Sequence, residues 1–300
     1  MTTKTLPRLE IIVPFHGENF SCIKNLQPPN DLSETIRTIF IYDGDLINNI
    51  ALKKANDQLV NDNKILKNIK SNGAGGSRNL GLKEASAEYV IFADSDDYID
   101  FKKLEHLLKN IDSSDITFCK SESKFNDLSG EQSARNISYN NAIDKYIRSR
   151  NKEDLKNIYV PWSKIFRREF LISHKINFNE VEASNDVMFS ISALVASKKI
   201  ATTSNSFYTV IDSKSSLTKK FTKSNVLSRF LELSKFNLFL RQNTNWKLHP
   251  MSAQIFLCFR VSFLLGIKAL IKSIYNRFPL FYSFGHALNI LKERGFTLLK

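Results

Sequence analysis

Three carboxylates follow directly on a short apolar run near the end of the first third of the chain. Tyr89–Ala93 contains only β-forming or small residues, and Asp94, Asp96 and Asp97 come immediately after it. Such a run predicts a strand that is buried on both faces. Carboxylates at this spacing repel one another unless a positive group lies among them. Mg²⁺ and Mn²⁺ are hard cations that commonly bind one or two carboxylates together with the phosphates of a substrate.

The position of the acidic stretch strengthens this interpretation. Ligands of open α/β sheets bind just outside the carboxyl ends of the strands, and the three carboxylates stand at such an end. We therefore predict a metal-assisted phosphate site. The competing interpretation is a solvated acidic turn, in which Asp97 or Asp100 is the N-cap of the helix that follows.

Alternating strands and helices precede the acidic stretch and must position it. Apolar runs predict strands over Leu9–Pro14, Thr35–Tyr42 and Lys64–Ile69, with helices near Phe20–Leu26, over Leu46–Leu59 and after the glycine-rich segment Ser71–Ser77. This alternation predicts an α/β fold with a mixed, mostly parallel sheet flanked by crossover helices. The glycine-rich segment opens a helix, where backbone N–H groups favour an anion.

Four motifs in register resemble those of the family 2 glycosyltransferases, which have the GT-A fold. They are Val13–His16, Tyr42–Gly44, Gly75–Asn79 with Gly81, and Ala93–Asp97, and the resemblance extends over residues 9–220. Two departures are visible. Tyr42 stands where the family has the first of two successive acids, and the glycine-rich segment is one residue short before Arg78.

The resemblance implies an inverting transfer of a sugar from a UDP-sugar donor, assisted by Mn²⁺ or Mg²⁺. Asp43 would then bind uracil, Arg78 would lie near the nucleotide, and Asp96 would be the metal ligand. The other nucleotide-sugar-binding residues implied are Pro14, Phe15, His16, Asp94 and Ser95.

Two further segments resemble the acceptor side of the family. The first is Val160–Leu171. Its Trp162 would either stack on a sugar ring or pack in the core. Its Lys164 would either bind a phosphate or pack its aliphatic chain in the core. The polar tract Lys120–Asn141 before this segment is interpreted as a mobile connection.

Asp186 is the residue that the resemblance implies as general base. Asn185 precedes it where the family has a glutamate, so a neighbouring like charge that would tune Asp186 is missing. A helix that begins at Ser184 or Asn185 would hold Asp186 in its first turn, where an acid also favours the helix dipole. Glu182 and Glu180 are alternative bases.

A basic segment follows Tyr208, which resembles a tyrosine near the C-terminal end of the family's catalytic domain. Ser206–Tyr208 and Ser215–Thr218 resemble that closing region, and Lys219 and Lys220 come next. We expect this segment to fold over the diphosphate when the donor binds, with Lys219 on the diphosphate side.

The C-terminal residues 221–300 form a second predicted region, after a catalytic domain over residues 1–220. Asn225–Gln242 has helical spacing, and Met251–Phe278 has an apolar stripe beside the cations Arg260 and Lys268. Those cations interrupt any membrane-spanning run, and the pattern is typical of a helix lying in a membrane interface. The alternative is a helix packed on the catalytic domain or on a second subunit, which keeps a homodimer open.

Amino-acid composition favours certain cellular compartments and classes of binding partner over others. The 300 residues carry a net charge of +13 and contain three cysteines with no paired spacing, which indicates neither a disulfide framework nor a zinc site and favours a reducing cytosol. The N-terminus lacks the apolar core of a signal peptide. The charge favours a polyanionic partner, but we predict no nucleic-acid binding because no zinc spacing, aromatic RNA motif or helix-turn-helix pattern is present.

Together these observations predict a peripheral enzyme at the inner face of the cytoplasmic membrane. It would transfer sugar from a UDP-sugar to a glycan or lipid-linked acceptor of bacterial surface polysaccharide. The alternatives are a degenerate transferase that binds nucleotide-sugar without turnover and a sugar nucleotidyltransferase. The nucleotidyltransferase is disfavoured because the loop Phe15–Asn19 lacks a glycine-rich run with basic residues.

Overall fold

The computed structural model describes residues 6–16, 20–43, 53, 55–69, 73–126, 131–212 and 221–281. The chain divides into two compact units: Met1–Glu180 with Phe189–Ser216, and Val181–Met188 with Leu217–Lys300. The boundary expected at residue 220 stays a prediction. The helix expected over Leu46–Leu59 lies largely outside the described residues.

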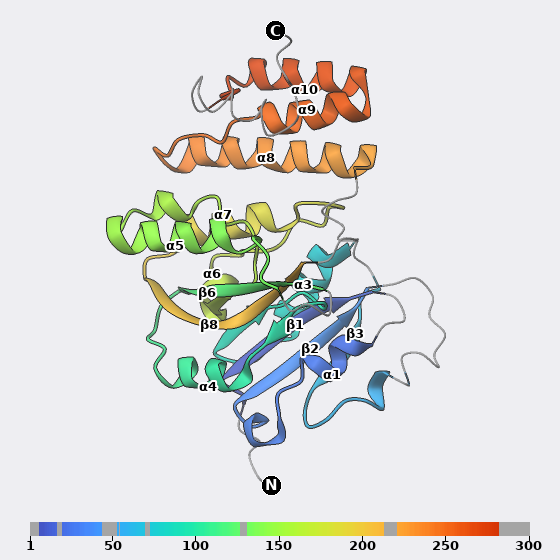
Figure 1. The fold of residues 1–300 in the computed structure, drawn as a ribbon, viewed down its shortest axis with the longest axis vertical. Helices are drawn as coiled ribbons and strands as arrows, with labels where there is room; N and C mark the ends of the chain where they lie inside the picture. The colour runs from blue at the N-terminus through green and yellow to red at the C-terminus, as the bar shows by residue number, and fades with distance from the viewer. Residues whose placement is uncertain are drawn as a thin grey trace. The chain divides into compact units, whose positions relative to one another are not determined.

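The first unit contains a mixed, mostly parallel sheet (Figure 1), as predicted. Its described strands are β1 (Leu9–Phe15), β2 (Ile36–Tyr42), β3 (Lys64–Lys67), β4 (Tyr89–Phe92), β5 (Tyr98–Ile99), β6 (Ile116–Phe125), β7 (Lys164–Arg167) and β8 (Ile200–Asp212). The strand order is β3-β2-β1-β4-β7-β6-β8-β5. The half formed by β3, β2, β1 and β4 is parallel, so the carboxyl ends of these strands lie along one edge.

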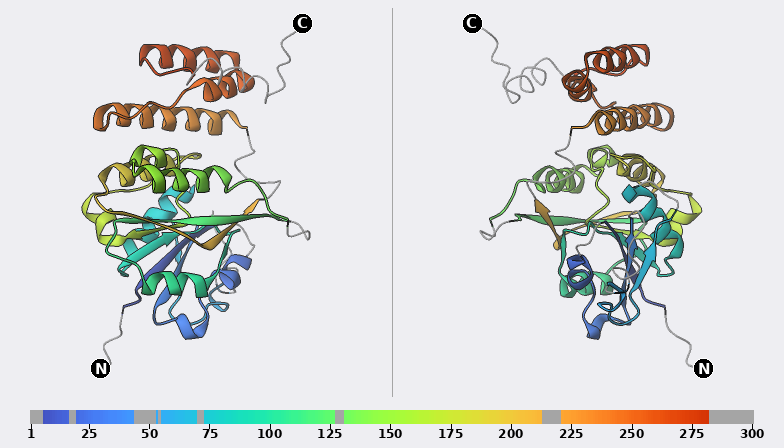
Figure 2. Two further views of the ribbon diagram at one scale, coloured as in Figure 1. Left: turned by 60° about the vertical axis from the view of Figure 1, so that its left-hand side comes forward. Right: turned by 90° about the vertical axis from the view of Figure 1, so that its right-hand side faces the viewer.

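Helices cover both faces of this sheet. The described helices of the first unit are α1 (Ser21–Asn25), α3 (Gly73–Glu84), α4 (Phe101–Lys109), α5 (Ile137–Ser149) and α6 (Arg168–Ser173), with short 3-10 turns at Asn30–Leu32 and Lys152–Leu155. Helix α5 packs on β6 from one face, and α4 packs against β8 from the other (Figure 2). Helix α7 (Asp186–Ala196) begins in the second unit and continues into the first.

Close packing of α3 on β1 brings the glycine-rich helix against the sheet. A Cβ atom at Gly81 would lie 2.4 Å from Cγ2 of Ile12, so only glycine permits this approach. Every residue of β1 is buried, and this burial explains the unbroken apolar pattern that predicted the strand.

A buried ion pair joins the starts of three strands. Glu10 on β1 is fully buried and accepts a hydrogen bond of 2.9 Å from Nε of Arg37 on β2. Its other carboxylate oxygen accepts a bond of 2.9 Å from the backbone N–H of Ala87, just before β4. The charge is therefore buried with its partners in place, which is the condition under which a buried ion is tolerated.

The interpretation of Lys120–Asn141 as a mobile connection is wrong for the described residues. Strand β6 continues to Phe125, and α5 begins at Ile137. The polar side chains complete hydrogen bonds of ordered structure: Ser123 donates to the carbonyl of Ser133 at 2.7 Å, and the side chain of Asn140 accepts from the N–H of Ser121 at 3.0 Å. A polar composition alone does not distinguish such a segment from a loop.

The second unit contains three further described helices, α8 (Lys223–Asn243), α9 (Ser252–Val261) and α10 (Phe263–Tyr275), with α9 packed against both others (Figure 1). The single apolar stripe expected over Met251–Phe278 is wrong, because the chain is extended at Ser262 and the helix breaks there. The buried residues of α10 are the small residues Gly266, Ala269 and Ser273. A Cβ atom at Gly266 would lie 2.2 Å from the ring of Phe259 on α9. None of the described helices is long and apolar enough to span a bilayer.

Candidate active site

The ends of β1 and β2 bring together His16 and Asp43, two residues that are predicted to bind the nucleotide-sugar. Strands β1 and β2 pair in parallel with Phe15 opposite Tyr42, and the N–H of Asp43 donates to the carbonyl of Phe15 at 2.8 Å. Nδ1 of the exposed His16 is hydrogen-bonded to the carbonyl of Asp43. Beneath them the rings of Phe15 and Tyr42 meet edge to face at 5.1 Å. Tyr42 thus fills a core position where the family has an acid. Pro14, which precedes Phe15 in β1, is also buried.

Arg78 on α3 reaches the acidic stretch after β4. Its guanidinium donates to Oδ1 of Asp94 at 2.6 Å, and its carbon Cζ lies 5.4 Å from the centre of the Phe178 ring. The side chain is nearly buried, so the positive charge is held in place between a carboxylate and an aromatic face. The structure therefore brings together Arg78 and Asp94, two of the residues predicted to bind the donor.

Asn79 is a residue whose role the sequence analysis missed. Its side chain donates to the carbonyl of Phe178 at 2.9 Å and accepts from the N–H of Phe178 at 2.8 Å. These two hydrogen bonds to the backbone of Phe178 hold in place the ring that lies against Arg78. Phe178 also stacks on Phe189 with ring centres 3.8 Å apart. Asn79 belongs to a quoted motif, but nothing in the sequence linked it to a residue 99 positions away.

The four residues Asp94–Asp97, called here the acidic loop, differ in exposure. Asp94 and Ser95 are half-buried, Asp96 is exposed and Asp97 is 6% exposed. The N–H of Asp97 donates to the carbonyl of Asp94 at 3.2 Å, which closes a turn. Of the two residues considered as N-cap of α4, Asp100 is the cap, since its side chain accepts from the N–H of Lys103 at 3.1 Å.

Electrostatics in the acidic loop favour a cation. Desolvation, together with the charge of Asp94, raises the pKa of Asp96. Burial, again with the charge of Asp94, raises the pKa of Asp97 well above its usual range. A divalent cation beside Asp94 and Asp96 would relieve this repulsion.

The carboxylates of the acidic loop fit a Mg²⁺ or Mn²⁺ ion whose other ligands are substrate phosphates and water. Among the described residues no three His, Cys, Asp or Glu side chains are grouped as metal ligands. Sites that take only one or two carboxylates and complete the coordination with substrate phosphates and water need no such group. Asp96 is the exposed carboxylate of the acidic loop, whereas Asp94 is paired with Arg78.

Trp162 and Lys164 both lie in the core. Trp162 is 3% exposed and stacks on Tyr208 with ring centres 5.8 Å apart. The buried ammonium of Lys164 donates to the carbonyl of Ile158 at 3.1 Å and lies over the ring of Phe118. For both residues the structure shows the core-packing alternative that the sequence analysis had left open.

Asp186 belongs to the second unit and stands in the first turn of α7, as expected. Helix α7 begins one residue after Asn185, and both side chains are half-buried. Ser184 adopts a left-handed conformation with φ of 61° just before the helix. The exposed Glu182 accepts a hydrogen bond from the hydroxyl of Ser224. Lys219 lies outside the described residues.

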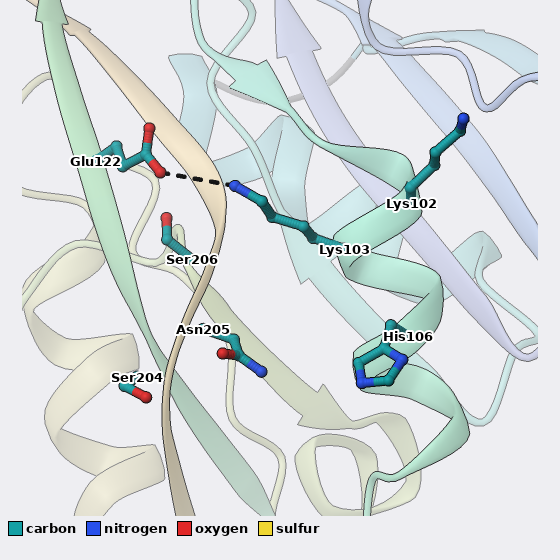
Figure 3. A pocket seen from close by; sticks show the side chains of 7 residues that line it. All are labelled: Lys102, Lys103, His106, Glu122, Ser204, Asn205 and Ser206. Carbon is teal, nitrogen blue, oxygen red and sulfur yellow. Dashed lines mark ion pairs between the residues drawn. The ribbon is translucent and has the colours of Figure 1, made fainter.

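A pocket of about 530 Å³ lies elsewhere on the first unit, between α4 and β8. Figure 3 shows its lining: Lys102, Lys103 and His106 from α4, Glu122 from β6, and Ser204, Asn205 and Ser206 from β8. Lys103 already pairs with Glu122 at 3.7 Å. No residue of the acidic loop lines this pocket, so the chemistry predicted for the acidic loop does not depend on it.

Comparison with known proteins matches the first unit to a family model. The model described as Glycosyl transferase family 2 covers residues 11–174. This range includes all four motifs that carried the resemblance and the acidic loop. The resemblance stated from those motifs is therefore confirmed.

Curated relatives cover parts of the chain. The protein named as glycosyltransferase EpsH in Bacillus subtilis (strain 168) is 22% identical over 71% of this chain and 63% of its own length. An uncharacterized glycosyltransferase of Haemophilus influenzae is 32% identical over 42% of this chain and 51% of its own. The poly(ribitol-phosphate) beta-glucosyltransferase of Bacillus spizizenii is 28% identical over 48% of this chain. The chain spans less than two thirds of the length of each of these relatives, 22% in the last case.

Solved structures share the fold. S. aureus TarS (residues 1–349) in complex with UDP-GlcNAc superposes with a TM-score of 0.61 at 19% identity, covering 83% of this chain and 70% of that one. The mannosyltransferase PcManGT of Pyrobaculum calidifontis, in complex with GDP-Man and Mn²⁺, gives a TM-score of 0.54 at 14% identity, covering 98% and 81%. These likenesses confirm the predicted GT-A type of fold.

Proposed function

Because the chain belongs to glycosyl transferase family 2, we propose that it is a glycosyltransferase that moves a sugar from a UDP-sugar to an acceptor hydroxyl with inversion. The observation that carries this proposal is the acidic loop at the carboxyl end of β4, with Arg78 bound to Asp94 and the carboxylate of Asp96 exposed. A nucleotide-sugar donor is supported by TarS, a fold neighbour solved with UDP-GlcNAc. Family membership also favours sugar transfer over the sugar nucleotidyltransferase alternative.

Residues at the sheet edge would bind the donor. His16 and Asp43 stand together after β1 and β2, where Asp43 would accept hydrogen bonds from uracil. Arg78 holds Asp94 in place for the ribose, and Ser95 lies next to it in the acidic loop. Asp96 would hold Mn²⁺ or Mg²⁺, which when bound supplies charge stabilisation for the departing diphosphate. PcManGT, solved with Mn²⁺, supports this choice of ion.

Asp186 would act as the general base. It would remove the proton from the acceptor hydroxyl as that oxygen attacks the anomeric carbon from the face opposite the leaving UDP, which inverts the centre. The first turn of α7 is a suitable place for a carboxylate, because the N-terminus of a helix favours a negative charge. Glu182 and Glu180 remain alternative bases, and Lys219 is retained as a diphosphate contact.

The proposal is tested by UDP release from a panel of UDP-sugars with Mn²⁺. We expect slow hydrolysis of one donor that EDTA abolishes, which would also identify the sugar. Mn²⁺-dependent UDP binding without any turnover, even with lipid-linked acceptors added, would favour the degenerate transferase. Absence of UDP binding would contradict the proposed donor class.

We further propose that the acceptor is a glycan or lipid-linked glycan of bacterial surface polysaccharide, met by a peripheral enzyme at the cytoplasmic face of an anionic membrane. The support lies on α10. This helix exposes Phe263 (75%), Ile271 (60%), Ile274 (60%) and Tyr275 (85%), and Lys272 is exposed on the same helix. Apolar side chains flanked by lysine are typical of helices that lie in a membrane interface.

The charge of residues 221–281, which contain α8, α9 and α10, fits an anionic surface. Residues 221–281 contain nine lysines and arginines and one acidic residue, Glu232, a net charge of +8. Each basic residue near an anionic membrane contributes about 1 kcal/mol. A second copy of the chain with the same charge would be repelled, which makes a lipid surface the better occupant of this face than a homodimer.

Vesicle co-sedimentation measures this membrane binding. We expect binding to vesicles of phosphatidylglycerol and phosphatidylcholine, weak binding to pure phosphatidylcholine, and at least about tenfold weaker binding after Phe263→Ser with Ile271→Ser, since each apolar side chain contributes about 1.5–3 kcal/mol when buried. Ile137→Ser on α5, also an exposed isoleucine, is the matched control and should bind like wild type. Equal binding of all variants would contradict the proposal, and a loss of dimers in the Phe263→Ser, Ile271→Ser variant would instead assign this face to a homodimer.

A further inference from the structure

One buried hydroxyl joins two residues of the acidic loop. The side chain of Tyr208 on β8 is fully buried. Its hydroxyl donates to Oδ2 of Asp97 at 2.7 Å and accepts from the backbone N–H of Asp94 at 3.0 Å. Donor and acceptor capacity are both used. The hydroxyl therefore fixes the distance between the first and the last residue of the acidic loop.

The same strand holds the loop at further points. Oδ1 of Asp97 accepts from the N–H of Ile211 at 2.8 Å. Just after the loop, β5 pairs antiparallel with β8, and the N–H of Asp100 donates to the carbonyl of Phe207 at 2.8 Å. Both carboxylate oxygens of Asp97 are thus engaged by β8. Asp97 is an anchor of the loop rather than a group that faces a ligand.

We infer that Tyr208 is a positioning residue, which acts through Asp97 and the Asp94 backbone to hold the acidic loop in the shape that binds the divalent cation and the donor diphosphate. This inference rests on the proposed function, since it assumes that Asp96 takes part in cation binding. Without the hydroxyl, the Asp94 N–H and the Asp97 carboxylate would each lose a hydrogen-bond partner in the protein interior. The loop would then rearrange or exchange with water, and the carboxylate of Asp96 would no longer be presented in one orientation.

The chain offers a matched control for a purely structural role. Tyr139 on α5 is also buried, and its hydroxyl donates to the carbonyl of Ser163 at 2.8 Å. Both tyrosine rings contact Trp162, with centres at 4.9 Å for Tyr139 and 5.8 Å for Tyr208. Tyr208→Phe and Tyr139→Phe each remove one buried hydroxyl from the same aromatic cluster. Only the first removes a bond to the acidic loop.

The experiment is a titration of Mn²⁺ into protein with saturating UDP, with free Mn²⁺ followed by its electron paramagnetic resonance signal. We expect Tyr208→Phe to raise the Mn²⁺ dissociation constant at least tenfold, and Tyr139→Phe to leave it within twofold of wild type. Hydrogen exchange of the peptide that contains the acidic loop should become faster in Tyr208→Phe alone. If Tyr208→Phe does not fold, Asp97→Asn tests the same contact, because the carboxylate uses one oxygen for Tyr208 and the other for Ile211, and asparagine has only one side-chain oxygen.

The outcomes separate the inference from the function on which it rests. Wild-type Mn²⁺ binding with an unchanged constant in Tyr208→Phe would overturn the positioning role and leave the metal-assisted function standing. Equal losses in Tyr208→Phe and Tyr139→Phe would assign both tyrosines to stability and would also overturn it. Wild-type protein that binds UDP but no Mn²⁺ would overturn the metal-assisted function, and the inference with it.

Discussion

Replacement of Asp96 by asparagine is expected to lower the rate of sugar transfer by about 10³-fold. Asparagine keeps the size of the side chain and removes the charge that would hold the divalent cation. Cation stabilisation of a departing diphosphate contributes several kcal/mol, and each 1.36 kcal/mol corresponds to a factor of ten in rate. The measurement is kcat for the active donor over a range of Mn²⁺ concentrations, which also reveals whether excess Mn²⁺ restores part of the rate.

Asp100→Asn is the matched control for this change. Asp100 lies in the same acidic stretch, but its side chain caps α4, and asparagine caps a helix about as well as aspartate. We expect wild-type kcat and an unchanged Mn²⁺ requirement. An Asp96→Asn variant that keeps more than a tenth of the wild-type rate would remove Asp96 from the cation site.

Replacement of Asp186 by asparagine is expected to lower kcat by about 10²–10⁴-fold, the range for loss of a general base. The donor KM and the affinity for UDP with Mn²⁺ should stay unchanged, because the base acts on the acceptor hydroxyl. Asparagine accepts a hydrogen bond at this position but cannot take the proton. Single-turnover transfer with saturating donor and acceptor measures the chemical step directly.

The same assay distinguishes Asp186 from Glu182 and Glu180 as the general base. Glu182→Gln and Glu180→Gln should transfer at the wild-type rate, since Glu182 is exposed and bound by the hydroxyl of Ser224. A large loss in Glu182→Gln together with a full rate in Asp186→Asn would move the base to Glu182. Full rates in all three variants would argue against carboxylate base catalysis from this segment.

The sequence alone determined the strands of the parallel half-sheet and the residues at its edge. An apolar run buried on both faces can be recognised without knowing its neighbours, and β1, β2 and β4 form where such runs predicted them. Because parallel strands end at a common edge, the place of the acidic loop after β4 followed from the order of the runs. The family likewise followed from four short motifs at this edge.

Some helix ends could also be predicted from the sequence alone. The first-turn position of Asp186 and the cap at Asp100 depend on residues within one turn of the chain, and both agree with local rules. The break at Ser262 did not follow, because the apolar spacing continues through it. The break places Gly266 against Phe259, a contact between two helices that periodicity within one helix does not report.

Only the tertiary structure distinguished the neighbouring carboxylates of the acidic loop. Asp96 is exposed and Asp97 is buried because β8, more than 100 residues later in the chain, supplies the hydroxyl of Tyr208 and the N–H of Ile211 to Asp97. The burial of Trp162 between aromatic side chains from α5 and β8 has the same origin. Such contacts depend on pairing between distant segments, and a local pattern of residue types contains no information about which distant donor will meet a given carboxylate.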